Sequence, residues 1–120
     1  LVCGALLLLA IQACESGPSG PGTLMGRVTG AGLGAAVIEV VGDGIGSFDG
    51  RGNTRAYAAP VGGPENTYRV ILIEPDGEDI LFQISVADVG MEGPVMTVVS
   101  AAGTDNVEMI VATIVARIER

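Results

Sequence analysis

Histidine, lysine and tryptophan are missing from this sequence of 120 residues, and cysteine occurs only at Cys3 and Cys14. Histidine is needed for Ser-His-Asp triads and Cys-His dyads, and lysine is needed for Schiff-base catalysis. A histidine-bearing zinc site is excluded on the same ground. We therefore expect no enzyme activity and no catalytic residue, and we assign no cofactor or metal ion to the chain.

Positive charge is also scarce, because six arginines stand against fourteen Asp and Glu residues and give a net charge of −8 at pH 7. Binding to nucleic acid depends on clustered Lys or Arg side chains that neutralise phosphates. The acidic balance argues against a nucleic-acid partner. It argues equally against binding of the folded domain itself to anionic lipid headgroups.

No apolar run reaches the length of about 20 residues that a membrane-spanning helix needs. The longest run is Ala5 to Ile11, which Gln12 ends. A run of roughly 7–15 apolar residues followed by small residues is typical of the central part of a secretory signal peptide. We interpret residues 1–13 as such a peptide. Since no Met precedes the run and no basic residue comes before Arg27, we expect that its basic n-region is missing from this sequence.

The signal peptide ends in the motif Ile11-Gln12-Ala13-Cys14, which resembles the lipobox of bacterial lipoproteins. The resemblance implies that the Cys14 thiol receives a diacylglycerol and that the chain is cleaved before this residue. It also implies a lipoprotein of the cell envelope, anchored to a membrane and facing the periplasm or the exterior. The alternative is an ordinary secretory signal cleaved after Ala13, which would leave a free thiol at Cys14.

Residues 15–22 read ESGPSGPG and contain no large apolar side chain. Such a composition forms flexible linkers, so residues 14–22 are interpreted as the lipidated cysteine and its tether. Residues 23–120 then have the length of one domain. We expect no disulfide, because Cys3 would leave with the signal peptide and Cys14 would carry the lipid.

Short apolar and β-branched runs, separated by Gly, Pro and Asp, predict a series of strands in residues 23–120. The predicted strands span 24–29, 35–41, 55–59, 67–74, 80–86 and 95–100. Gly42 to Gly46 is predicted as a turn that returns Ile45 to the core, and residues 49–53 are predicted as a polar loop.

The two central strands differ in pattern. Residues 67–74 form a nearly continuous apolar run, which is typical of a buried strand. Residues 80–86 alternate, which places Phe82 on the core side and Gln83 on the opposite face. Between these strands, Pro75-Asp76-Gly77-Glu78 has the composition of a tight turn, and we predict a hairpin that pairs them.

The last segment, residues 107–118, supports two interpretations. Its large apolar residues fall on one helical face, and Asp105 with Glu108 could cap a helix. However, seven of its twelve residues are β-branched, which favours a strand. We predict a strand, because every confident element before it is one.

These elements predict an all-β fold, a single antiparallel β-sandwich. Its order of glycine-rich strands and a Pro-Asp-Gly turn is similar to the cohesin-like and carbohydrate-binding-like sandwiches of short bacterial lipoproteins. The resemblance spans residues 22–120 and implies an immunoglobulin-like or cohesin-like sandwich. It transfers no catalytic residue.

Two groups of residues could still suggest a ligand. Gly30-x-Gly32-x-x-Ala35 satisfies a loose dinucleotide fingerprint, but no helix can follow it, so we interpret it as a strand connection. Glu74, Asp76, Glu78 and Asp79 form the densest acidic cluster, and carboxylates at a turn could hold Ca²⁺. We interpret this cluster as a solvated turn.

The sequence thus predicts a lipid-anchored binding or structural module of the cell envelope, without catalytic activity. Its partners would be the membrane, through Cys14, and an envelope protein or a polysaccharide bound through an edge strand or loop. The alternative is a Ca²⁺-dependent carbohydrate binder, or a hydrolase accessory domain, that uses the carboxylate loops.

Overall fold

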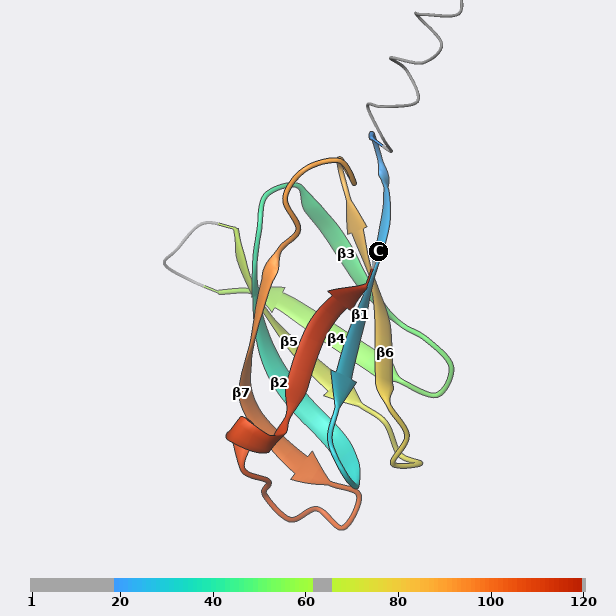
Figure 1. The fold of residues 1–120 in the computed structure, drawn as a ribbon, viewed down its shortest axis with the longest axis vertical. Helices are drawn as coiled ribbons and strands as arrows, with labels where there is room; N and C mark the ends of the chain where they lie inside the picture. The colour runs from blue at the N-terminus through green and yellow to red at the C-terminus, as the bar shows by residue number, and fades with distance from the viewer. Residues whose placement is uncertain (1–18, 62–65, 120) are drawn as a thin grey trace, which may run out of the picture.

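The computed structural model describes residues 19–61 and 66–119, which form eight β-strands and one short 3-10 helix (Figure 1). The elements are β1 (Gly22–Thr29), β2 (Leu33–Val41), β3 (Ile45–Gly50), β4 (Arg55–Pro60), β5 (Thr67–Ile73), β6 (Ile80–Val86), β7 (Val95–Gly103), η1 (Val111–Thr113) and β8 (Val115–Glu119). No helix in these two ranges is long and apolar enough to cross a membrane.

The strands form two four-stranded sheets that pack face to face. The first sheet has the order β3-β6-β1-β8 and the second has the order β4-β5-β2-β7. All strand pairs in both sheets are antiparallel. The prediction of an all-β antiparallel sandwich is therefore confirmed.

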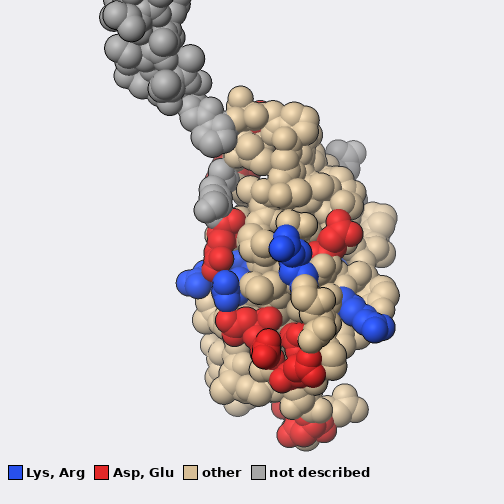
Figure 2. Space-filling model, turned by 90° about the vertical axis from the view of Figure 1, so that its right-hand side faces the viewer, with Lys and Arg blue, Asp and Glu red and all other residues tan. Residues whose placement is uncertain are grey.

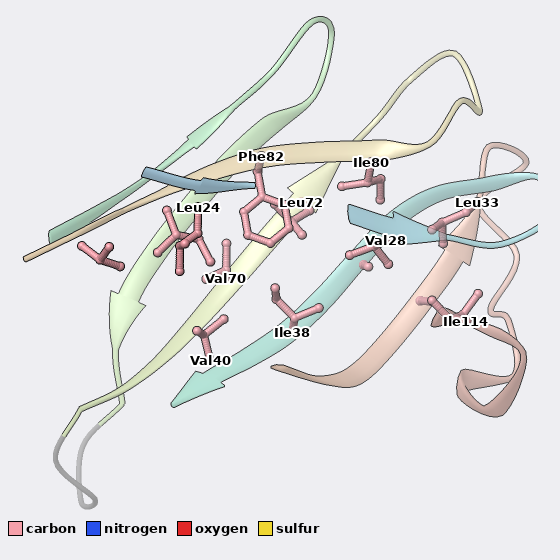
Figure 3. Close-up of a cluster of buried hydrophobic side chains, with 14 residues drawn as sticks. Leu24, Val28, Leu33, Ile38, Val40, Val70, Leu72, Ile80, Phe82 and Ile114 are labelled. Carbon is pink, nitrogen blue, oxygen red and sulfur yellow. The ribbon is translucent and has the colours of Figure 1, made fainter. Parts of the chain in front are cut away.

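The core lies between the two sheets and follows from strict alternation in their central strands. In β6, buried residues alternate with half-buried ones, and Phe82 is fully buried whereas Gln83 is on the opposite face. Figure 3 shows the Phe82 ring pointing from β6 into the space between the sheets, beside Leu72. All buried apolar residues of the described chain lie between Leu24 and Ile114, so the part that begins at Ser19 contains every core residue that the structure describes.

The predicted hairpin of residues 67–74 with 80–86 is wrong. β5 belongs to the second sheet, where it pairs with β2 and β4, and β6 belongs to the first sheet, where it pairs with β1 and β3. The turn between them crosses from one sheet to the other, and at its start the N–H of Glu74 still bonds to the carbonyl of Gly34 in β2 at 2.8 Å. Pro, Asp and Gly permit such a crossing as readily as a hairpin, because they fix the local turn and not the strand that follows.

Two further predictions need correction. Residues 45–50, predicted as part of a turn and a polar loop, form β3 and pair with β6, although Ile45 does pack against the core as expected. The segment 107–118 is mostly not a strand, because η1 interrupts it and only β8 pairs with β1. Its apolar residues could not all face a core, and Val107 and Ile110 are exposed.

The glycine-rich stretch after β1 is a strand connection, as predicted. The N–H of Leu33 bonds to the carbonyl of Gly30 at 3.1 Å, which closes a tight turn. Gly32 has φ +73°, a left-handed conformation that glycine adopts without a steric cost. The chain enters β2 directly after this turn, with no helix that could receive a phosphate.

Candidate functional site

The predicted lipidation site, Cys14, lies outside the described residues, as do the signal peptide 1–13 and residues 15–18 of the tether. These assignments remain predictions. The structure instead shows how the segment before β1 joins the sandwich, what the carboxylate loops bind and which surfaces remain open.

The junction of tether and sandwich is fixed by Asp88, in the connection between β6 and β7. Its Oδ1 accepts hydrogen bonds from the N–H groups of Gly20 and Gly90, both at 2.9 Å. The N–H of Val89 donates to the Gly20 carbonyl at 2.9 Å. We call these three hydrogen bonds the clip at Asp88. The N–H groups of Gly90 and Gly20 favour the charged carboxylate and lower the pKa of Asp88. The chain is thus held to the domain two residues before β1 begins.

The acidic cluster between β5 and β6 is divided among separate partners within the protein. Glu74 is buried, and its Oε2 accepts the N–H of Asp76 at 2.6 Å. The Oδ2 of Asp76 accepts from the side-chain amide of Asn53 at 2.7 Å. Asp79 forms an ion pair with Arg27 at 2.8 Å. Because these carboxylates bind internal donors, they do not converge on a common point.

The other loop carboxylates behave in a similar way. Asp43 accepts the side-chain amide of Asn66 at 2.6 Å, and Asp49 lies in β3 beside Ser47. Asp43, Asp49 and Asn53 are thus each joined to another side chain. Within residues 19–61 and 66–119, no group of three or more acidic, His or Cys residues could hold a metal ion.

We expect the melting temperature of the folded chain to be the same in millimolar Ca²⁺ and in EDTA. An ion that binds only the native state stabilises it by RT ln(1 + [Ca²⁺]/Kd), so a site with a Kd well below millimolar would raise the melting temperature. Differential scanning fluorimetry with Mg²⁺ as the control measures this directly. A rise in melting temperature that is specific to Ca²⁺ would show that the chain binds this ion and would support the carboxylate loops as a metal site.

The outer face of the first sheet carries an ionic network. Arg27 of β1 donates from Nε to Glu119 at 2.7 Å and from Nη1 to Asp79 at 2.8 Å, and Arg117 also lies 3.2 Å from Glu119. The hydrogen bond from Arg27 is the main reason that the pKa of Glu119 is lowered. Figure 2 shows one side of the molecule, where basic and acidic side chains lie next to one another and the acidic ones gather in the lower half. The network fixes the edge strand β8 against β1.

The outer face of the second sheet is largely apolar. β5 was predicted to be buried, but it is buried on one face only, and the outward Ile71 and Ile73 are 45% and 38% exposed. In the register of the sheet, Ile71 lies between Tyr57 of β4 and Val37 of β2, and Tyr57 is 54% exposed. We call this surface the apolar face. Its outward positions, in register, are Arg55, Ile73, Ala35 and Ala102, then Tyr57, Ile71, Val37 and Ser100, then Ala59, Arg69, Glu39 and Thr97.

A shallow hollow of about 290 Å³ lies at one side of the apolar face. Its floor comes from β2, β5 and β7, and its rim includes Asn106 and Glu108. Glu108 is placed there because it forms an isolated antiparallel bridge with Ala102, at the edge of β7. The hollow is therefore part of the apolar face and not a separate pocket.

The sequence analysis placed its candidate site at Cys14, interpreted the acidic cluster as a solvated turn and did not identify the apolar face. The face depends on the register between strands, because Val37, Ile71 and Tyr57 come from three segments that were each predicted only as a strand. In β2, a run of apolar residues supplies both faces of the strand, so composition alone does not separate buried from exposed side chains. Comparison with known proteins gives no match, since no family model, curated protein or solved structure is significantly similar to the chain.

Proposed function

We propose that the protein is a non-catalytic, lipid-anchored module of the cell envelope that acts by binding. The observation that carries the proposal is the order of its parts: an apolar run, the motif Ile11-Gln12-Ala13-Cys14, a short tether and one sandwich that begins at Gly22. The absence of histidine and lysine supports the non-catalytic part. The predicted resemblance to cohesin-like sandwiches agrees with such a role and stays a prediction.

The junction at Gly20 sets how the domain would stand on a membrane. Only five residues lie between Cys14 and Gly20, and the six steps from one residue to the next span at most about 20 Å. The clip at Asp88 holds Gly20 at the end of the sandwich where β1 begins. A lipid on Cys14 would place this end next to the membrane, and the sheet faces would stand beside it, open to partners.

The binding surface in this proposal is the apolar face, with an envelope protein favoured over a polysaccharide. Sugar recognition usually needs planar aromatic side chains beside hydrogen-bonding groups, and this face offers only Tyr57. Its other outward residues are mostly aliphatic, and Arg69 and Glu39 form an ion pair at 3.3 Å. A Ca²⁺-dependent sugar binder is less well supported, because the loop carboxylates are already bonded within the chain.

The anchor is tested by Cys14→Ala in a chain with a complete signal peptide. We expect the wild-type protein to incorporate radiolabelled fatty acid and to partition into detergent after extraction. The variant should do neither and should retain its signal peptide. Equal release of both proteins into the soluble fraction, with no label in the wild type, would exclude lipidation.

A further inference from the structure

The apolar face combines exposed aliphatic residues with four charges arranged by sign. Arg55 and Arg69 lie on the side of β4 and β5, whereas Glu39 and Glu108 lie on the side of β2 and β7. The four charges cancel, although the chain as a whole carries −8. Two copies of this acidic protein repel each other in general, but not at this face.

The arrangement of these charges is self-complementary about one axis. Two copies can face each other about a two-fold axis that lies in the plane of contact, parallel to the strands and midway between β5 and β2. In this arrangement, β5 of each copy lies opposite β2 of the other copy. Arg69 and Glu39 are directly paired across the two strands, so each would face its opposite charge on the second copy. Arg55 would face the second copy's Ala102, one strand away from its Glu108.

The same axis brings the apolar residues together. Ile71 and Val37 are paired across β5 and β2 and would face each other between copies, as would Ile73 and Ala35. Tyr57 would lie over the second copy's Ser100, at the edge of the hollow. Antiparallel sheets in sandwiches pack face to face about 10 Å apart in this way.

We infer that the apolar face is an interface between two copies of this chain, packed sheet to sheet about a two-fold axis parallel to the strands. Such an interface needs an apolar centre and charges that lie opposite charges of the other sign, and both are present. The opposite charges face each other only when the second copy is related by that axis. A partner with a single sign of charge would match only half of the face.

The size of the face sets the strength of the dimer. Four strands spaced about 4.8 Å apart, over about seven residues of 3.3 Å each, cover about 450 Å² on each copy. The total, about 900 Å², is below the roughly 1,200–2,000 Å² of a standard stable interface. The dimer is therefore weak, with a dissociation constant in the micromolar range or above.

This inference rests on the part of the proposed function that gives the apolar face a protein partner, and it identifies that partner as a second copy of the chain. It does not rest on the proposed anchor, although the two are compatible. A two-fold axis parallel to the strands turns the Gly20 ends of both copies in the same direction. Two tethers could then reach the same membrane. Confinement to a membrane raises the effective concentration, which is how a weak dimer becomes populated.

The test is sedimentation equilibrium of the chain from Ser19 onward, which contains every core residue that the structure describes, over about 10 μM to 1 mM. The wild type should show a monomer–dimer equilibrium. R69E or E39R places like charges opposite each other twice in the dimer, so each variant should weaken association by about tenfold or more. The exchange R69E/E39R should return the dissociation constant to within about threefold of the wild-type value, because it restores every pairing.

The matched control is R117E, which breaks the pair of Arg117 with Glu119 on the first sheet and leaves the apolar face unchanged. It should not alter association, whereas I71R should abolish it while circular dichroism still shows a folded strand spectrum. A wild type that stays monomeric up to 1 mM would overturn the inference. Equal weakening of association by R117E and R69E would also overturn it, as would a double exchange that does not recover association. Association that survives I71R would overturn it as well, and would indicate edge-to-edge pairing of strands instead.

Discussion

Phe82→Ala is expected to lower the free energy of unfolding by about 3–5 kcal/mol, the range for truncation of a buried Phe. Phe82 is the largest fully buried side chain of the described chain, and its ring projects into the centre of the core (Figure 3). Its neighbours are aliphatic residues such as Leu72 and Ile38, which are themselves fully buried and cannot swing in to fill the space. Typical domains have only about 5–15 kcal/mol in total, so the variant should be largely or fully unfolded at 37 °C.

Urea melts followed by circular dichroism measure this loss. Gln83→Ala is the matched control, because it is the next residue of β6 and lies on the opposite face. It should change the free energy of unfolding by about 0.5 kcal/mol or less, as surface substitutions do. A larger loss in Gln83→Ala than in Phe82→Ala would contradict the observed orientation of β6.

Gly26→Ala should be destabilising by about 1–3 kcal/mol, the usual cost of overpacking a core. Gly26 lies directly opposite Phe82 in the pairing of β1 with β6, and an added Cβ would overlap the aromatic ring. In an ordinary position, replacing Gly by Ala stabilises a protein by about 0.4–1 kcal/mol through the unfolded state. The sign of the effect is therefore diagnostic of the contact.

A double-mutant cycle separates this contact from a general intolerance of the strand. Gly26→Ala should cost clearly less in a Phe82→Leu background, because the smaller side chain leaves room for the new methyl group. Urea melts of the four proteins give the coupling energy. If the two changes are additive within about 0.5 kcal/mol, the ring does not occupy the space above Gly26.

Local patterns predicted some elements well. Residues 80–86 were predicted as an alternating strand with Phe82 inward, and the structure gives these bounds and this orientation. A strand was also predicted for residues 55–59, and the structure has β4 there, extended by one residue to Pro60. β3 was missed because its sequence, IGSFDG, contains two glycines and an aspartate, and only its pairing with β6 makes it a strand.

The candidate site was less predictable. The carboxylates between β5 and β6 looked like a possible ion site because they are close in sequence. Folding brings Arg27 of β1 and Asn53, from the connection between β3 and β4, to the carboxylates and uses the carboxylate oxygens internally. The apolar face was invisible in the sequence, since Tyr57, Ile71 and Val37 come from three strands that only the sheet aligns.

The sequence by itself determined the all-β class, the acidic surface charge and the side of β6 that faces the core, because each depends on composition or on a period of two within one strand. Tertiary structure alone decided which strands lie side by side. A turn such as Pro75 to Glu78 fixes a local change of direction, and either a hairpin or a crossing between sheets satisfies it. The choice depends on burying the apolar faces of all strands at once, which gathers one set of side chains into the core and leaves another exposed on the second sheet.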